Sequence, residues 1–101
     1  MTVLDSRHLH SIGNISVYLD ALEEDSPYLS WDDTGETTAA IERGDLVLFC
    51  ARVRVLRKGI PIGSTYLGNC VYDSLDDFMQ PQGYFIDMVR EAFRDAREWL
   101  A

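Results

Sequence analysis

Apolar and polar residues alternate along two stretches of the chain. Between Ile15 and Asp20 every second residue is apolar, which is the period of a strand with one buried face. From Leu46 to Leu56 one face is apolar throughout, whereas the other is apolar only as far as Cys50 and then carries Arg52 and Arg54. A central strand that emerges from under a helix has this pattern. Both stretches are therefore predicted to be strands.

A turn and a returning strand are predicted after Leu56. Ile62–Tyr72 is the expected partner strand, with bulges at Gly63 and Gly68, because glycine inside a strand often marks a bulge. The residues of the loop between the two strands are either Gly59-Ile60-Pro61 or Lys58-Gly59.

Two segments in the first half of the chain have weaker patterns. Tyr28–Trp31 is predicted to be a short strand. Thr37–Arg43 fits either another strand or one helical turn that ends at Gly44, since glycine readily adopts the left-handed conformation that stops a helix.

The last quarter of the chain predicts two helices. Ser74 is expected to cap a short helix that ends near Met79, before Pro81, because a residue that precedes proline disfavours helix. After Gly83, apolar residues recur at steps of three and four for about 17 residues, which predicts an amphipathic helix. Its apolar stripe consists of Phe85, Met88, Val89, Ala92, Phe93, Ala96, Trp99 and Leu100. The predicted fold class is α+β, with an antiparallel sheet of about four strands packed on this C-terminal helix as a two-layer sandwich.

Length and the distribution of apolar residues limit the class of protein. The chain has 101 residues, which is enough for one domain with its own core, so residues 1–101 are predicted to form a single domain. No apolar run approaches the ~20 residues that cross a bilayer. Met1–His10 lacks the apolar segment of a signal peptide. We therefore expect a cytoplasmic protein.

The two cysteines, Cys50 and Cys70, lie on the two strands of the predicted hairpin. The three-residue loop would place them opposite each other, and the two-residue loop would not. Thiols stay reduced in the cytoplasm, and free cysteine packs as a small apolar residue. We expect buried thiols rather than a disulfide.

Charge is unevenly distributed. The net charge is −8, which argues against direct binding to nucleic acid or to an anionic membrane. Asp20–Asp45 contains nine acidic residues and one base, whereas Leu46–Tyr72 contains four bases and no acid. The acidic segment either pairs internally with the basic hairpin (Arg52, Arg54, Arg57 and Lys58) or is offered to a basic partner protein.

The tripeptide Asp33-Thr34-Gly35 has the sequence that aspartic proteases use at their catalytic site. Those enzymes need two such carboxylates in a buried site, each loop following an apolar strand. Here Asp32 precedes the tripeptide and Glu36 follows it, and charged neighbours are typical of a solvated turn. We interpret Asp33-Thr34-Gly35 as a turn and expect no catalytic residue.

Other motifs predict no cofactor and no metal. His8 and His10 would lie on one face of a strand, but Zn²⁺ needs at least three protein ligands, so Met1–His10 is interpreted as a polar arm. The acidic run from Asp32 lacks the spacing of a calcium-binding loop. Such a loop has a bidentate glutamate at its twelfth position, and the twelfth residue counted from Asp32 is Arg43. No glycine-rich phosphate loop follows a strand.

The run IGSTYLGNCVYDSLDDFMQPQGYFIDMVREAFRDA resembles the C-terminal half of small acidic proteins that phages, plasmids and other mobile elements encode. That resemblance covers about a third of the chain. It implies a place in the cytoplasm of a bacterial host and a role like that of anti-CRISPR or anti-restriction inhibitors. Such inhibitors bind nucleic-acid-handling enzymes, some by placing carboxylates where phosphates would lie.

Three function classes follow. The first is a non-enzymatic protein-binding inhibitor or adaptor that presents its acidic surface to a basic protein or complex. The second is a structural or oligomeric accessory module, with a homodimer left open. The third is a small enzyme or ligand-binding domain with a pocket near Tyr66, Asn69 and Tyr72. Under the first, the expected binding residues are Glu23, Glu24, Asp25, Trp31, Asp32, Asp33 and Glu36, with Trp31 as an aromatic anchor among carboxylates.

Overall fold

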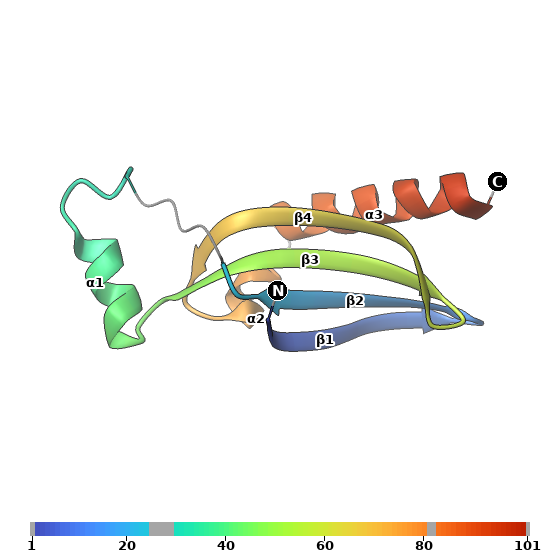
Figure 1. Ribbon diagram of the computed structural model, residues 1–101, viewed down its shortest axis with the longest axis horizontal. Helices are drawn as coiled ribbons and strands as arrows, with labels where there is room; N and C mark the ends of the chain where they lie inside the picture. Colours follow the sequence, from blue (N-terminus) through green and yellow to red (C-terminus); the bar gives the residue numbers. More distant parts are fainter. Residues whose placement is uncertain (1, 25–29, 81–82, 101) are drawn as a thin grey trace.

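A four-stranded antiparallel sheet in the order β1-β2-β3-β4 forms the body of the protein (Figure 1). The computed structural model describes residues 2–24, 30–80 and 83–100. Its elements are β1 (Val3–Ile12), β2 (Ile15–Leu22), α1 (Glu36–Arg43), β3 (Val47–Arg57), β4 (Ile60–Tyr72), α2 (Leu75–Phe78) and α3 (Tyr84–Leu100). The predicted α+β class, with an antiparallel sheet and a C-terminal helix, is confirmed.

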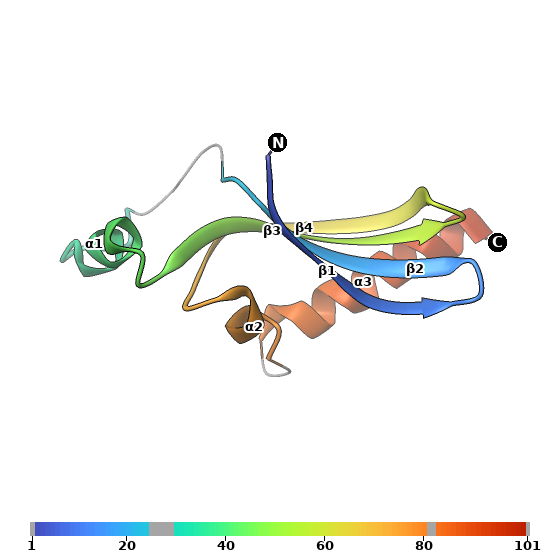
Figure 2. The same ribbon diagram turned by 90° about the horizontal axis from the view of Figure 1, so that it is seen from below.

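The helix α3 covers only one side of one sheet face. It packs against β4 and β3. Figure 1 shows it alongside β4, and Figure 2 shows that it runs at an angle to the strands. The short helix α2 adds Leu75 and Phe78 at one end of the same face. The sheet face that points away from α3 is called the open face below.

The hydrophobic core lies between the sheet and the helices. Every second residue of β3 from Phe49 to Val55 is buried there, with Val17, Leu19 and Ala21 from β2. Phe78 stacks edge-on against Phe49, with 5.5 Å between ring centroids. Because the alternation expected from the sequence is present in both strands, their apolar faces meet α2 and α3 as the pattern predicts.

The β3–β4 turn is Lys58-Gly59, since Arg57 pairs with Ile60. Both turn residues have positive φ, 50° and 80°, as the two-residue turns that match strand twist require. Cys50 therefore does not lie opposite Cys70: Phe49 pairs with Cys70, and Cys50 sits in a bulge facing Gly68 and Asn69. Both cysteines are buried and neither forms a disulfide, as expected.

The two predicted bulges of β4 are present, with one difference. Gly68 lies in the bulge between Leu67 and Cys70, and Asn69 beside it has a φ of 53°. At the other bulge the extra residue is Ile62, and Gly63 borders it. Gly63 has a different role, because α3 crosses directly above it.

One strand was assigned to the wrong segment by the sequence pattern. The polar arm expected at the N-terminus is the edge strand β1. Of the strand expected at Tyr28–Trp31, Ser30 and Trp31 form a turn, and Tyr28 and Leu29 lie outside the described residues. The sheet nevertheless has four strands, close to the predicted number, because β1 joins it as a strand that the pattern did not predict.

The remaining expectations concern helices. Thr37–Arg43 is helical, within α1, and Gly44 ends that helix with a φ of 84°. The Ser74 hydroxyl accepts a hydrogen bond from Asp77 N at 3.1 Å, so Ser74 caps α2 as predicted. The predicted length of α3, about 17 residues, is also confirmed.

Candidate functional site

Residues 30–45 form an acidic arm that stands away from the body of the protein. Its helix α1 lies beyond the end of the sheet, separate from α2 and α3 (Figure 1). The molecule is correspondingly long, with extents of 49 × 27 × 19 Å. The acidic segment thus contributes a projecting element instead of lying flat on the basic hairpin.

Asp32 holds the start of α1 in place. Its carboxylate accepts hydrogen bonds from Thr38 N at 2.8 Å, Thr38 Oγ1 at 2.9 Å and Thr37 N at 3.3 Å. The backbone hydrogen bond from Thr38 is the main reason why the pKa of Asp32 lies below its usual value. Because both carboxylate oxygens serve the helix start, Asp32 is a structural residue rather than a free anion.

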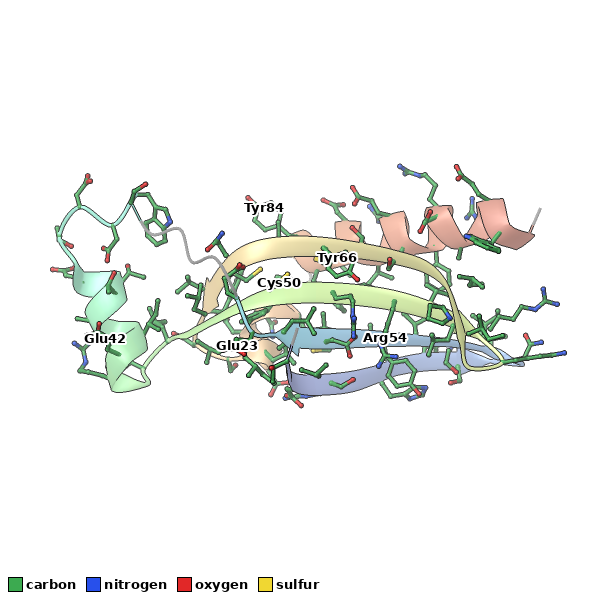
Figure 3. All side chains as sticks on the ribbon, viewed as in Figure 1. Glu23, Glu42, Cys50, Arg54, Tyr66 and Tyr84 are labelled. Carbon is green, nitrogen blue, oxygen red and sulfur yellow. The ribbon has the colours of Figure 1, made fainter. Side chains whose placement is uncertain are left out.

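Four residues of the arm point outward into solvent. Asp33, Glu36 and Glu42 are exposed, and the described residues provide no ion-pair partner for any of the three. Figure 3 labels Glu42 on α1, apart from the sheet. Asp33-Thr34-Gly35 is the exposed turn that leads into α1, as interpreted. Trp31 is 54% exposed, which is unusual for so large an aromatic side chain.

Trp31 lines a shallow depression of about 280 Å³ at the end of β4. Leu67, Cys70 and Tyr72 contribute to its floor, and Asn69 is also part of it. Tyr66 lies on the open face instead, so the pocket expected around Tyr66, Asn69 and Tyr72 does not form as one site.

The other predicted binding residues are divided. Glu23 is exposed at the end of β2 (Figure 3). Glu24 is half-buried, and its Oε2 accepts a hydrogen bond from Asn69 N at 2.8 Å, which ties the chain to β4. Asp25 lies outside the described residues. Of the seven predicted residues, Glu23, Trp31, Asp33 and Glu36 are thus exposed, whereas Glu24 and Asp32 make structural contacts.

Asp20, the first acid of the acidic segment, pairs with the basic hairpin. It is fully buried on the open face, where Arg52 Nε and Arg54 Nε lie 2.8 and 2.7 Å from Oδ2 and the Ser6 hydroxyl donates to Oδ1 at 2.6 Å. Burial favours the neutral acid, but hydrogen bonds from Arg54, Ser6 and Arg52 outweigh it and hold the pKa of Asp20 below its usual value.

Aromatic rings extend this cluster across the open face. The Arg54 guanidinium lies 4.6 Å from the centroid of the Tyr18 ring, and His8 meets the same ring edge-on at 5.2 Å. Figure 3 shows Arg54 over the central strands. Asp20 therefore forms the internal ion pairs with the basic hairpin that the sequence allowed. The exposed acids of the acidic arm do not belong to this cluster.

His8 and His10 do not share a strand face, contrary to the expectation. A β-bulge at Leu9 shifts the register between them, so that His8 pairs with Tyr18 and His10 with Val17. The extra residue turns the two imidazoles to opposite sides of the sheet. Within the described residues, no three histidine, cysteine or acidic side chains come together to hold a metal ion.

A second surface feature, the α3 groove, was not expected. This groove of about 330 Å³ lies between α3 and the β1–β2 half of the sheet, and it is almost wholly apolar. Its walls include Leu9, Val17, Met79, Ile86, Val89 and Phe93. His10 also lines it. The spacing of Ile86, Val89 and Phe93 was visible in the sequence, but the position of α3 across the sheet was not.

Comparison with known proteins places the chain in no group, since no protein-family model, curated protein or solved structure matches it. The resemblance to mobile-element proteins therefore stays a prediction. Among the described residues, every helix is too short or too polar to cross a membrane.

Proposed function

We propose that the protein is a non-enzymatic protein-binding module that engages a basic partner through Trp31 and the exposed carboxylates of the acidic arm. The observation that carries this proposal is the arm itself, which presents an exposed tryptophan beside acids that the fold does not use. A side chain such as Trp31 loses apolar exposure when it docks, and tryptophan is enriched among interface anchors.

The chemistry of the arm favours a basic partner. Asp33, Glu36 and Glu42 all carry negative charge on a narrow projection, where neighbouring cations are few. Nucleic-acid-handling proteins present basic surfaces that have evolved to hold phosphates. An inhibitor or adaptor of such a protein is the first function to test, and an origin in a mobile element stays a prediction.

The test is affinity capture from a nuclease-treated bacterial lysate. The native chain is compared with the arm-reversed variant, in which Asp33, Glu36 and Glu42 are each changed to Lys. We expect the native chain to retain a basic protein that the variant loses, and Trp31→Ala to weaken retention as well. Retention should fall between about 0.1 and about 0.5 M salt, because exposed charges are screened.

A control variant carries the same change of charge elsewhere, with Asp73, Asp87 and Glu98 changed to Lys. These acids are exposed and lie off the arm. If the control loses the partner as completely as the arm-reversed variant, net charge and not the arm determines binding. If the arm-reversed variant keeps the partner, the acidic arm is a solvated surface and the proposal is wrong.

A further inference from the structure

We propose that the α3 groove is a second docking site, which takes an amphipathic helix of a partner protein that is apolar on one face and acidic along one flank. This site is independent of the acidic arm. It lies on a different part of the molecule, and its charge has the opposite sign.

The sheet is wider than the single long helix that packs on it. Strands lie ~4.8 Å apart, so four strands measure roughly 14 Å between the outer two. Packed helices lie about 8–10 Å apart, so two helices side by side cover such a face. Here α3 packs mainly on β4 and β3, and α2 has four residues. The inward side chains of β2 are already buried, so the uncovered part of this face is the groove beside α3 that Leu9 and His10 of β1 also line.

The side of α3 that faces the groove is apolar. Ile86, Val89 and Phe93 recur at steps of three and four and form a stripe beside the residues that α3 buries in the core. Phe93 remains 37% exposed. A partner helix would bury these side chains together.

Charge specifies the kind of helix. Arg90, Arg94 and Arg97 follow one another at steps of four and three and line the outer side of α3 next to Val89 and Phe93. The one ion pair that the described residues give this row is a loose contact of 3.8 Å between Arg90 and Asp87. An apolar groove with a row of arginines on its rim is complementary to an acidic amphipathic helix and repels a basic one.

The acidic flank of α3 argues against a second copy of α3 as the occupant. Asp95 accepts a hydrogen bond from Ser64 N at 3.1 Å, and Glu91 accepts one from Thr65 Oγ1 at 3.1 Å. These carboxylates are held at the edge of their own β4. They would have to leave it to reach the arginines of another copy.

The length of the groove sets the probe. From Ile86 to Arg97 the helix rises by roughly 16 Å, so a helix of about three turns is sufficient. The acidic probe is a fluorescein-labelled peptide of about 14 residues with leucines at steps of three and four and glutamates along one flank. The basic probe has lysines in place of the glutamates. Binding of both to the full chain is measured by fluorescence anisotropy.

We expect the acidic probe to bind about tenfold more tightly than the basic probe, since several rim charges act together. Arg94→Glu with Arg97→Glu should weaken the acidic probe about tenfold and reverse the preference. Both arginines are exposed, so this variant should fold. The control is Arg43→Glu with Lys58→Glu, which changes the charge equally outside the groove and should leave both affinities unchanged.

A second variant separates the groove from charge alone. Phe93→Ser removes apolar contact without altering the charge and should weaken both probes. Equal binding of both probes to every variant would show non-specific adhesion and overturn the proposal, as would no binding at all. Dimerisation of the native chain in sedimentation, abolished by Phe93→Ser, would assign the groove to a second copy and also overturn it. The arm-reversed variant should bind the acidic probe at least as well as the native chain.

Discussion

Gly63 lies where α3 approaches the sheet most closely. A Cβ built at this position would be 2.7 Å from Ala96 N and 2.9 Å from Ala96 Cβ, and would also collide with Ala92 O. Two of these atoms are backbone, so they cannot rotate away. The small residues Gly63, Ala92 and Ala96 therefore set the distance between the helix layer and β4.

Gly63→Ala is expected to destabilise the protein by about 2 kcal/mol, because α3 must shift outward from a packed core. The free energy of unfolding is measured by urea titration, with circular dichroism as the probe. Gly68→Ala is the matched control on the same strand. Its Cβ would meet only the end of the Glu24 side chain, at 3.3 Å, and should cost less than about 0.5 kcal/mol. Equal losses in both variants would contradict the role assigned to Gly63.

The sequence identified Gly63 as unusual but for a different reason. A glycine inside a strand suggests a bulge, and a bulge is indeed next to it. The contact with Ala92 and Ala96 joins residues about 30 positions apart, and no local pattern reports on such a contact. Asp20 is a similar case. Its pairing with Arg52 and Arg54 depends on the register of β2 against β3.

At the scale of elements, α1 depends on its cap more than on its packing. The segment Thr37-Thr38 has residues that favour strands as much as helices, which is why the sequence left its structure open. The carboxylate of Asp32 at one end and the left-handed Gly44 at the other decide in favour of helix.

Asp32→Ala should therefore loosen α1 without unfolding the sheet. Without its anionic cap, α1 should open more often, and its backbone amides should exchange with solvent several-fold faster in hydrogen–deuterium exchange. The midpoint of urea unfolding of the sheet should change little. Asp33→Ala, one residue away and exposed, is the control that should leave exchange unaltered. Faster exchange throughout β3 in Asp32→Ala would show that α1 supports the sheet after all.

The strands and helices that the sequence predicted correctly are those with one sustained period. The predicted α3 keeps its period for 17 residues, and β2 and β3 alternate cleanly. In β1 the bulges at Leu4 and Leu9 interrupt the alternation, and an edge strand with exposed faces has few apolar residues to show it. Bulges and charged residues on an edge strand also discourage pairing with other chains. The irregular pattern that made β1 hard to predict therefore protects this edge of the sheet from association.

The whole molecule carries surfaces of opposite sign in spite of its net charge of −8. The acidic arm lies beyond one end of the sheet, and the arginine row of α3 borders the apolar groove. Composition reported only the acidic excess. The spacing of Arg90, Arg94 and Arg97 in the sequence already placed these arginines on one side of α3. That this side borders an apolar groove became clear only from the structure.

The protonation of Asp20 should determine how the free energy of unfolding depends on pH in the acid range. Its pKa is lowered in the folded protein, so the stabilisation from the ionised form is complete above the usual value of 3.8. It is lost as the pH falls through the folded pKa. Asp20→Asn should reduce this acid sensitivity and lower the free energy of unfolding at pH 7 by about 2 kcal/mol. The loss is smaller than for a fully buried pair, since the arginines reach water.

Urea titrations at pH 7 and at about pH 3 measure both effects. Asp33→Asn serves as the control, because Asp33 is exposed and joins no ion pair of the described residues. An Asp20→Asn variant with the stability of the native chain at pH 7 would show that the cluster contributes nothing net.

The order of the strands has a consequence for how the chain folds. Two hairpins, β1–β2 and β3–β4, are each closed by two residues, whereas residues 23–46 separate β2 from β3. Short hairpins form within microseconds, and closing a longer loop costs more entropy, ~0.6 kcal/mol for each doubling of length. The two hairpins should therefore form first and dock later along β2 and β3. In that sequence of events the contacts of Asp20 with Arg52 and Arg54 form late, and shortening the loop would speed the docking without altering either hairpin.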